Sequence, residues 1–362
     1  MNVLVVGGSG FVGSNLCREL VERGHEVAAL SRNPDEGDLP AEVERLSGDV
    51  TAYDSIEAAF EGRDAVVNLV ALSPLFKPSG GNERHFEVHL GGTENCVRAA
   101  EEHGVGHLVQ MSGIHASPTA DTAYLKSKGE AEEAVRQSSL DWTIFRPTVL
   151  FGEGDEIRSF TKLVATPYLT PLPGGGEQQF QLMWIEDFVP LMADAIEGET
   201  GDLGEEEGVE TAEESDAGDD DDAAEAADED ETEEGGEEDE EATEVEVDED
   251  ADGDVNPHVG KIYEVGGPEV QSFAEVVRLT WAAENKPTSV VPVPMALADV
   301  GLSVLGSIGG PLGSDQAKSL RKDLIVEHND IDAFGVDPED LTTYAEYLGV
   351  DPAAAQPDRA RA

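Results

Sequence analysis

The first thirty residues change from a strand pattern to a helix pattern and back. Four apolar residues, Val3–Val6, are typical of a parallel strand that is covered on both faces. A glycine-rich turn follows, and the apolar residues of 11–21 then recur with the spacing of one helix face. A second strand pattern covers 25–30. The chain therefore begins with a predicted strand, turn, helix and strand.

The same alternation continues to about residue 150. Further strand patterns cover 64–70, 107–111 and 142–146, and helical patterns cover 55–60, 83–103 and 122–138. Strands that alternate with helices predict a parallel sheet with right-handed crossovers. We expect an α/β fold in which residues 1–150 form a Rossmann-like, doubly wound dinucleotide-binding domain.

Beyond residue 150 the alternation gives way to loops rich in proline and glycine. A helix is predicted over 187–196, a strand over 261–265, and helices over 272–283 and 341–348. An apolar stretch at 290–312 is broken by prolines, Asp299 and glycines, which makes it too short to span a membrane. A core helix is preferred there over a contact with a membrane surface. We expect a smaller substrate-binding C-terminal region (151–196 and 256–350), an inserted acidic loop (197–255) and a flexible tail (351–362).

Charge is very unevenly distributed along the chain. The segment Glu197–Asp254 holds 33 of the 79 acidic residues and no Lys or Arg, and its composition predicts disorder. The other residues hold 46 acidic and 22 basic side chains, a net charge of −24. Without a basic patch, nucleic-acid binding is not expected. The acidity resembles that of proteins from microbes with molar salt in the cytoplasm, and no signal peptide precedes the first strand. We expect a halophilic, cytoplasmic protein.

The glycines after the first strand predict a phosphate-binding turn. Gly7, Gly10 and Gly13 fit G-x-x-G-x-x-G, and Gly8, Gly10 and Gly13 fit G-x-G-x-x-G. Glycine lets the backbone turn tightly and lets a pyrophosphate approach the main chain, where the helix start offers free N–H groups. The expected cofactor contacts at this turn are Gly7, Gly10, Phe11, Val12 and Gly13.

The end of the second strand predicts which cofactor binds. An acidic residue there suits the ribose of NAD, whereas an arginine suits the 2′-phosphate of NADP. This chain has Ser31 and Arg32, a hydroxyl and a guanidinium. We expect a preference for NADP(H), with NAD(H) as the alternative cofactor and a solvated loop arginine as the alternative interpretation of Arg32.

Two residues on the predicted helix over 122–138 suit acid–base chemistry. Tyr124 and Lys128 lie four apart and so share one helix face. An ammonium beside a phenol is expected to lower the pKa of the phenol. His85 and His89 have the same spacing, but no third zinc ligand is evident and a polar helix face explains them, so no metal is expected.

Several motifs together resemble those of the extended and atypical short-chain dehydrogenases/reductases. They are the glycine turn, Tyr124-x-x-x-Lys128 and Arg146–Gly152. Three further motifs resemble those of one branch, which includes the NAD(P)H-binding accessory subunit of respiratory complex I. These motifs are Thr143–Pro147, Gly266–Pro268 and Ser314–Gln316. The resemblance covers nearly the whole chain apart from the acidic insert.

The resemblance implies roles for individual residues. Tyr124 would donate or accept the proton, Lys128 would hold the nicotinamide ribose, and Ser112 would orient the substrate oxygen. Asp49 and Val50 resemble the pair that contacts adenine, and Pro147 belongs to the motif beside the cofactor. The chain departs from the family pattern at His89, where asparagine is usual. Two interpretations are open: His89 relays a proton in place of the asparagine, or the change marks a loss of catalysis.

Two functions follow from these expectations. The first is an oxidoreductase that moves hydride between NADP(H) and a small carbonyl or alcohol. The second is a nucleotide-binding accessory subunit, without turnover, of a respiratory or quinone-related complex at the membrane periphery. The expected partners are a small-molecule substrate and, for the second function, a membrane respiratory complex with which the protein associates peripherally. The protein itself is expected to be a monomer or a homodimer.

Overall fold

The computed structural model describes residues 1–200, 256–294, 318 and 322–356. Most of the predicted acidic insert, residues 201–255, lies outside the described residues. So do the motif Ser314–Gln316 and the larger part of the apolar stretch at 290–312. The predicted C-terminal tail is described as far as residue 356, and it begins with a short 3-10 turn, Pro352–Ala355, in which Ala355 is buried.

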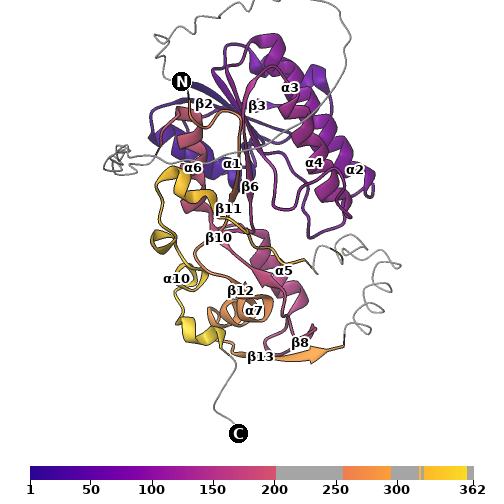
Figure 1. The fold of residues 1–362 in the computed structure, drawn as a ribbon, viewed down its shortest axis with the longest axis vertical. Helices are drawn as coiled ribbons and strands as arrows, with labels where there is room; N and C mark the ends of the chain where they lie inside the picture. The colour runs from indigo at the N-terminus through magenta and orange to yellow at the C-terminus, as the bar shows by residue number, and fades with distance from the viewer. Residues whose placement is uncertain (201–255, 295–317, 319–321, 357–362) are drawn as a thin grey trace, which may run out of the picture. The chain divides into compact units, whose positions relative to one another are not determined.

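Seven parallel strands form the central sheet, in the order β11-β6-β5-β4-β1-β2-β3 (Figure 1). Their bounds are β1 Asn2–Val6, β2 Glu26–Ser31, β3 Glu44–Ser47, β4 Ala65–Asn68, β5 His107–Met111, β6 Asp141–Pro147 and β11 Lys261–Val265. The strand order reverses at β1, between β2 on one side and β4 on the other. Ligands of open parallel sheets bind at the carboxyl ends of the strands beside such a reversal.

Helices cover both faces of this sheet, as Figure 1 shows. In β1, Val3 and Val5 belong to a core with α1 and α6, whereas Leu4 and Val6 belong to a core with α3 and α4. Successive strand residues point to opposite faces, so a run of apolar residues is what two covered faces require. The predicted doubly wound, Rossmann-like fold is confirmed. The helices are α1 Phe11–Glu22, α2 Glu83–His85, α3 Gly91–His103, α4 Ala123–Arg136 and α6 Ile185–Glu197.

Two predicted helices differ from the structure. The helix expected over 83–103 is divided into α2, a π turn η3 (Phe86–Leu90) and α3. The helix expected over 55–60 is two 3-10 turns, η1 (Tyr53–Ser55) and η2 (Glu57–Phe60). The π turn carries His89 and places its ring in the interior, which is consistent with the frequent use of π turns at functional sites.

A second core lies under the C-terminal segments. Its large buried side chains include Phe151, Phe160, Phe180 and Phe273. The elements around it are β7 Leu150–Phe151, α5 Glu156–Val164, β8 Tyr168–Pro173, β9 Gln179–Phe180, β10 Met183–Trp184, β12 Gln271–Ser272, α7 Phe273–Ala282, β13 Thr288–Val293 and α10 Tyr344–Leu348. The strands form three pairs, β7 with β10, β8 with β13 and β9 with β12. Two short turns, η4 (Asp330–Phe334) and η5 (Pro338–Asp340), complete the described chain.

The chain returns to the central sheet after the acidic segment. β11, which follows the segment, pairs with β6 in parallel. α6, which precedes it, packs on the same core as α1, so the elements before and after the segment both belong to the fold around the central sheet. The helix α6 also runs through Glu197, the first residue of the predicted insert. The Glu197 carboxylate pairs with Arg23 and His25. The insert was therefore predicted to begin too early at this end.

Hydrogen bonds hold the two described ends of the acidic segment together. Asn256 Nδ2 donates to the carbonyl of Ala195 at 2.8 Å, and His258 Nε2 donates to the carbonyl of Glu199 at 2.8 Å. The His258 ring is buried and stacks on Phe334, with the ring centroids 4.7 Å apart. The segment therefore leaves and re-enters the fold at one place.

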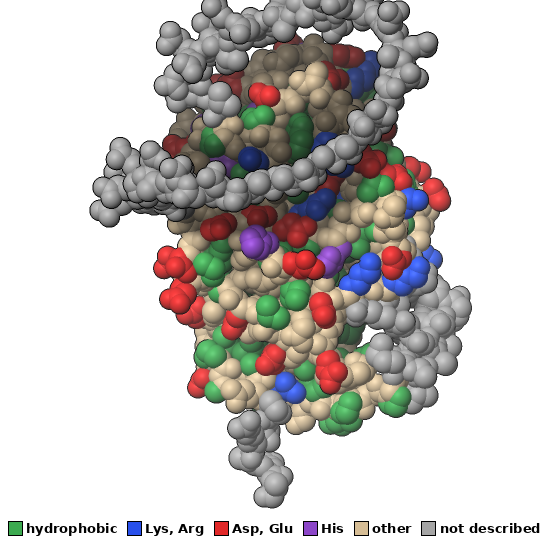
Figure 2. All heavy atoms as spheres, in the orientation of Figure 1, with side chains coloured by type: hydrophobic (Ala, Val, Ile, Leu, Met, Phe, Trp, Pro, Cys, Tyr) green, Lys and Arg blue, Asp and Glu red, His purple; other side chains and the backbone are tan. Residues whose placement is uncertain are grey.

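Acidic side chains are spread over the face of the molecule in Figure 2, and several lysines and arginines lie together at its right-hand edge. This distribution agrees with the net charge of −24 outside the acidic segment. Such a surface repels itself in dilute buffer and less so at molar salt, where the screening length is about 3 Å.

We predict that the acidic segment is dispensable for folding. Replacing residues 202–254 with a short Gly-Ser linker should leave the melting temperature at molar salt nearly unchanged, because loop closure costs only about 0.6 kcal/mol per doubling of loop length. Thermal melts monitored by circular dichroism measure this. A second deletion that also removes Glu197 should melt at a lower temperature, since His25 loses its carboxylate partner and Arg23 keeps only Glu19 and Asp194. Loss of the folded state in the first variant would contradict the prediction.

Candidate functional site

The glycine turn between β1 and α1 is built by very close backbone packing. Gly7 has a φ of +91°, which favours glycine, and Gly10 caps the start of α1. A Cβ on Gly13 would lie 2.3 Å from the carbonyl oxygen of Gly7, and one on Gly8 would lie 2.5 Å from the Cβ of Ala29 on β2. Gly8 thus packs on β2. The glycines of the pattern G-x-x-G-x-x-G, Gly7, Gly10 and Gly13, line the cavities described next.

Two cavities meet at this turn. One has a volume of about 350 Å³ and the other of about 260 Å³, and Gly7, Gly10 and Leu69 line both. Ala71 and Leu72 are also shared, so the loop after β4 lies along both cavities. The N-terminus of α1, with its free N–H groups, begins at the same place. A dinucleotide needs this arrangement of two pockets on either side of a phosphate-binding turn.

The smaller cavity collects the residues predicted for the adenosine end. Ser31, Arg32, Asp49 and Val50 all line it. The Ser31 Oγ is buried and makes no hydrogen bond with the described residues. A buried hydroxyl without a partner costs free energy, so a ligand oxygen at this point would satisfy it.

The Asp49 carboxylate is held in its charged form. Its Oδ1 accepts hydrogen bonds from the backbone N–H of Thr51 at 3.0 Å and from the Thr51 hydroxyl at 2.8 Å. The Thr51 N–H is the largest cause of a lowered pKa for Asp49, and the guanidinium groups of Arg32 and Arg84 add to it. Arg84 also lines the cavity and was missed from the sequence, because it reaches the cavity from α2.

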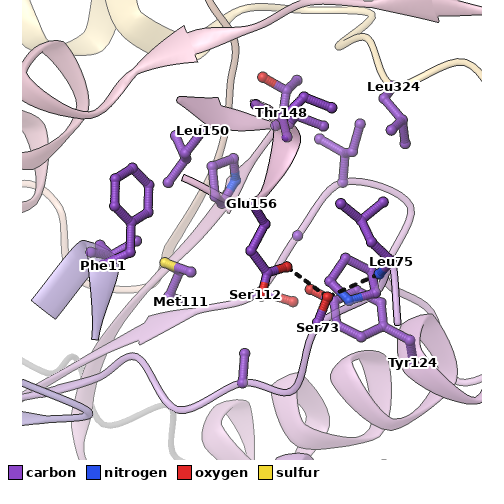
Figure 3. A pocket seen from close by; sticks show the side chains of 18 of the residues that line it. Phe11, Ser73, Leu75, Met111, Ser112, Tyr124, Thr148, Leu150, Glu156 and Leu324 are labelled. Atoms are coloured by element: carbon purple, nitrogen blue, oxygen red, sulfur yellow. Dashed lines mark hydrogen bonds between the residues drawn. The ribbon is translucent and has the colours of Figure 1, made fainter. Parts of the chain in front are cut away.

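The larger cavity contains two of the three residues predicted for the reaction, Ser112 and Tyr124, and several of the predicted cofactor contacts. Gly13, Ser112 and Tyr124 line it, together with Phe11, Val12 and Pro147. The Ser112 Oγ is buried, and it has no hydrogen-bond partner among the described residues. Figure 3 shows Ser112 and Tyr124 in this cavity beside the hydrogen bond between Glu156 and Ser73.

The pKa of Tyr124 is opposite to the sequence expectation. Burial raises the pKa of Tyr124 to about 12, and the nearby carboxylate of Glu156 adds to the increase. Lys128, which was expected to lower this pKa, is itself buried and donates from Nζ to the carbonyl of Met111 at 2.8 Å. Loss of hydration therefore dominates at the phenol, and Tyr124 is a neutral donor near neutral pH.

Lys128 does not line either cavity. Its side chain is 1% exposed, and burial lowers its pKa to about 8, although Glu132 acts in the opposite direction. The carbonyl that it holds belongs to Met111, the last residue of β5 and the neighbour of Ser112. In this structure Lys128 supports the strand end that carries Ser112.

His89 connects the loop after β4 to α4. Its Nε2 accepts from the backbone N–H of Leu72 at 2.9 Å, so the proton of the neutral ring is on Nδ1, which donates to Ser127 Oγ at 2.9 Å. Ser127 Oγ donates in turn to the carbonyl of Tyr124 at 2.9 Å. Burial, and then the charge of Lys128, lower the pKa of His89 to about 2. His89 is thus a neutral structural residue with both nitrogens engaged.

The sequence suggested that His85 and His89 lie on a polar helix face, but the structure buries both side chains. His85 and His89 are 0% and 1% exposed. Their rings meet the ring of Tyr124 edge to face, with centroids 5.8 Å and 5.3 Å away. The pair therefore packs around the candidate catalytic phenol.

Glu156 is a cavity residue that sequence reasoning missed. It is the first residue of α5, which is capped by the side chain of Asp155, and its Oε2 accepts a hydrogen bond from Ser73 Oγ at 2.6 Å. The aspartate cap followed by a helical pattern could have revealed the helix. Its proximity to Ser73 could not be read locally, since the two residues are 83 positions apart.

Comparisons with known proteins agree with the predicted dinucleotide-binding fold. Residues 7–167 match a family described as NAD(P)H-binding. A 3 beta-hydroxysteroid dehydrogenase/Delta 5-->4-isomerase of Mycobacterium tuberculosis is 33% identical over 181 residues, which are 42% of this chain and 48% of that protein. The mitochondrial NADH dehydrogenase (ubiquinone) 1 alpha subcomplex subunit 9 of Arabidopsis thaliana is 27% identical over 210 residues, 55% of this chain and 51% of that protein.

A solved structure extends the likeness to the whole fold. The UDP-glucose 4-epimerase of Thermus thermophilus, in complex with NAD, superposes with a TM-score of 0.62 at 19% identity and covers 98% of this chain and 99% of that one. This chain carries an NAD(P)H-binding domain at residues 7–167, and its fold resembles that of the epimerase. It spans about half the length of the curated relatives that it matches.

The match to an NAD(P)H-binding family agrees with the resemblance drawn from the motifs, and the coarser cofactor prediction, NAD or NADP, is confirmed. Within the described residues, no helix has the length and the apolar character needed to cross a membrane.

We predict that His89 makes stability depend on pH. The unfolded chain takes up a proton near pH 6.5 at this residue, whereas the folded protein resists protonation down to about pH 2. The free energy of unfolding should therefore fall as pH drops below 6.5, by at most about 1.4 kcal/mol per pH unit from this group. Urea unfolding of the wild type and of His89→Asn at pH 7, 6 and 5 measures the difference.

The variant His89→Asn should show a shallower decline than the wild type. Replacement of the exposed His328 by asparagine is the matched control and should leave the decline unchanged. Equal slopes for the wild type and His89→Asn would show that the buried ring is not the source.

Proposed function

We propose that this protein is an oxidoreductase that transfers hydride between NADP(H) and a small carbonyl or alcohol substrate. The observation that carries the proposal is a pair of buried hydroxyls that have no partner among the described residues, Ser31 in the smaller cavity and Ser112 in the larger one. The cavities meet at the glycine turn, so one dinucleotide would reach both hydroxyls.

The residues present fit a bound dinucleotide. Gly7, Gly10 and the start of α1 would receive the pyrophosphate through backbone N–H groups. Asp49 and Val50 would hold the adenine, and Phe11, Val12, Gly13 and Pro147 would enclose the nicotinamide. Lys128 would reach the nicotinamide ribose only by leaving the carbonyl of Met111. When bound, the nicotinamide group supplies or accepts the hydride.

The chain's own residues would handle the proton. Ser112 Oγ would donate a hydrogen bond to the substrate oxygen and orient it. Tyr124, kept protonated by a pKa of about 12, would give its proton to that oxygen as charge develops on it. A protonated phenol is a donor, so this arrangement favours reduction of a carbonyl. His89 would not relay protons, because both of its nitrogens are engaged.

We predict that Tyr124→Phe removes most turnover and leaves cofactor binding almost intact. The phenol would act on the substrate oxygen, and acid–base catalysis contributes about 10²–10⁴-fold. The assay is NADPH oxidation with a panel of ketones, with cofactor affinity measured separately by calorimetry. Tyr168→Phe alters an exposed tyrosine on β8 and should behave as wild type. Equal turnover by Tyr124→Phe and wild type would remove Tyr124 from the mechanism.

We predict a tighter binding of NADPH than of NADH, which depends on Arg32. Hydrogen bonds to a charged group contribute about 1.5–3 kcal/mol, so the preference should be about tenfold to a hundredfold. Calorimetric titration of both cofactors against wild type and Arg32→Ala measures it. Arg98→Ala, at a surface arginine paired with Glu102, is the control. Tighter NADH binding by the wild type, or an unchanged NADPH affinity in Arg32→Ala, would overturn the assignment.

The second candidate is a nucleotide-binding accessory subunit of a respiratory or quinone-related complex. The relative from Arabidopsis thaliana and the engagement of His89 and Lys128 favour it. Copurification in molar salt, with an assay of NADPH oxidation, separates the two candidates. Binding of cofactor without turnover, together with a copurifying complex, supports the subunit. The halophilic character, the cytoplasmic location and the monomeric or dimeric state stay predictions.

A further inference from the structure

One side of the larger cavity is an apolar wall formed by Leu75, Val149, Phe160, Phe180 and Leu324. Phe160 and Phe180 are 1% exposed and belong to the second core. The other three are half-buried and pack against that same core. The wall is therefore the open face of a packed cluster, which keeps its shape without a ligand.

Backbone hydrogen bonds hold Leu324, the wall residue that comes last in the chain, in place. Leu324 donates its N–H to the carbonyl of Gln179 at 2.7 Å and accepts at its own carbonyl from Gln181 at 2.9 Å. These bonds tie Leu324 to the strand β9 that carries Phe180. Figure 3 shows Leu324 and Leu75 in the cavity that also holds Ser112 and Tyr124. A ligand oxygen at Ser112 would thus bring the rest of the ligand toward the wall.

The polar groups along the cavity already have protein partners, apart from the candidate catalytic ones. Thr148 donates its hydroxyl to Gln181, and His115 donates from Nε2 to the carbonyl of Asp323 at 2.9 Å. The ammonium of Lys322 lies 3.6 Å from the carboxylate of Asp121. Among the described residues that line the cavity there is no arginine. The described part of the lining therefore offers no cluster of free cations to a diphosphate other than that of the cofactor.

The cavity lining also carries a negative charge beside the candidate catalytic residues. Glu156 and Tyr124 line the same cavity, and the carboxylate adds to the rise in the pKa of the phenol. Its hydrogen bond from Ser73 keeps the carboxylate at the cavity edge. An anionic ligand would be repelled there, whereas a neutral one would not.

We propose that the larger cavity binds neutral, predominantly apolar carbonyl compounds or the corresponding alcohols, and not nucleotide sugars or other anions. The reacting oxygen lies at Ser112 and Tyr124, and the carbon skeleton lies against the apolar wall. Glu156 determines specificity by disfavouring negative charge. This substrate class rests on the proposed function, and binding can be measured without turnover.

The test compares three probes, 2-octanone, 7-oxooctanoate and UDP-glucose, by calorimetry against the full chain in molar salt, with and without NADP⁺. We expect 2-octanone to bind, 7-oxooctanoate to bind about tenfold more weakly, and UDP-glucose not to displace 2-octanone. The replacement Glu156→Gln should reduce the gap between the ketone and the keto acid by about twofold to threefold, because Glu156 is exposed and molar salt screens part of its charge.

Leu324→Asn should weaken binding of 2-octanone by about tenfold, because it places an amide in the wall while the backbone bonds remain. The matched control is Leu169→Asn, at an exposed leucine on β8 outside the cavity lining, which should bind as wild type. Thermal melts of both variants check that they fold alike.

The outcomes separate the two proposals. Binding of 2-octanone that depends on Leu324 but is not followed by NADPH oxidation supports the apolar site and contradicts the oxidoreductase. Tight binding of UDP-glucose, a preference for 7-oxooctanoate, or 2-octanone binding that is unaffected by Leu324→Asn overturns the apolar site.

Discussion

The close approach of helix α1 to the end of strand β1 is the constraint on which the rest of the site depends. A side chain at Gly13 would collide with the carbonyl of Gly7, 2.3 Å from its Cβ position. Only glycine permits this spacing, and the spacing brings the first N–H groups of α1 to the point where the two cavities meet. Because β1 is the strand at which the order of the sheet reverses, the same contact places the phosphate site at the centre of the fold.

Burial determines how the ionisable groups around Tyr124 behave. Loss of hydration raises the pKa of the phenol and lowers those of Lys128 and His89, so all three are displaced toward their neutral forms. The spacing Tyr124-x-x-x-Lys128 implied instead a charged lysine that acts directly on the phenol. In the structure only Tyr124 of these three faces the cavity. Lys128 instead holds the end of β5, and His89 holds the loop after β4.

Local signals in the sequence were sufficient for the sheet and for much of the site. The glycines, Ser31 and Ser112 lie at or just after strand ends, and the parallel topology brings strand ends together. Tyr124 lies in the first turn of α4, where the spacing to Lys128 pointed to it. Elements with weak local signals were missed. β3 is an exposed edge strand, so its residues show no apolar alternation, and β8 contains prolines that its two-stranded pairing tolerates.

Contacts between distant segments could not be predicted from patterns of this kind. Glu156 at the start of α5 meets Ser73 in the loop after β4, and Arg84 reaches the smaller cavity from a short helix. His89 was recognised as a departure from the family pattern, but its role depends on a π turn that the helical spacing conceals. The expectation that Lys128 lowers the pKa of Tyr124 was wrong for a related reason. Burial sets this pKa, and burial depends on the whole fold and not on the local spacing.

The most direct test of this account is a crystal structure of the protein grown with NADP⁺ in molar salt. The account predicts the pyrophosphate at Gly10 and the start of α1, the 2′-phosphate beside Ser31 and Arg32, and the nicotinamide beside Ser112 in the larger cavity. A pyrophosphate bound away from α1, or a nicotinamide outside the larger cavity, would contradict it.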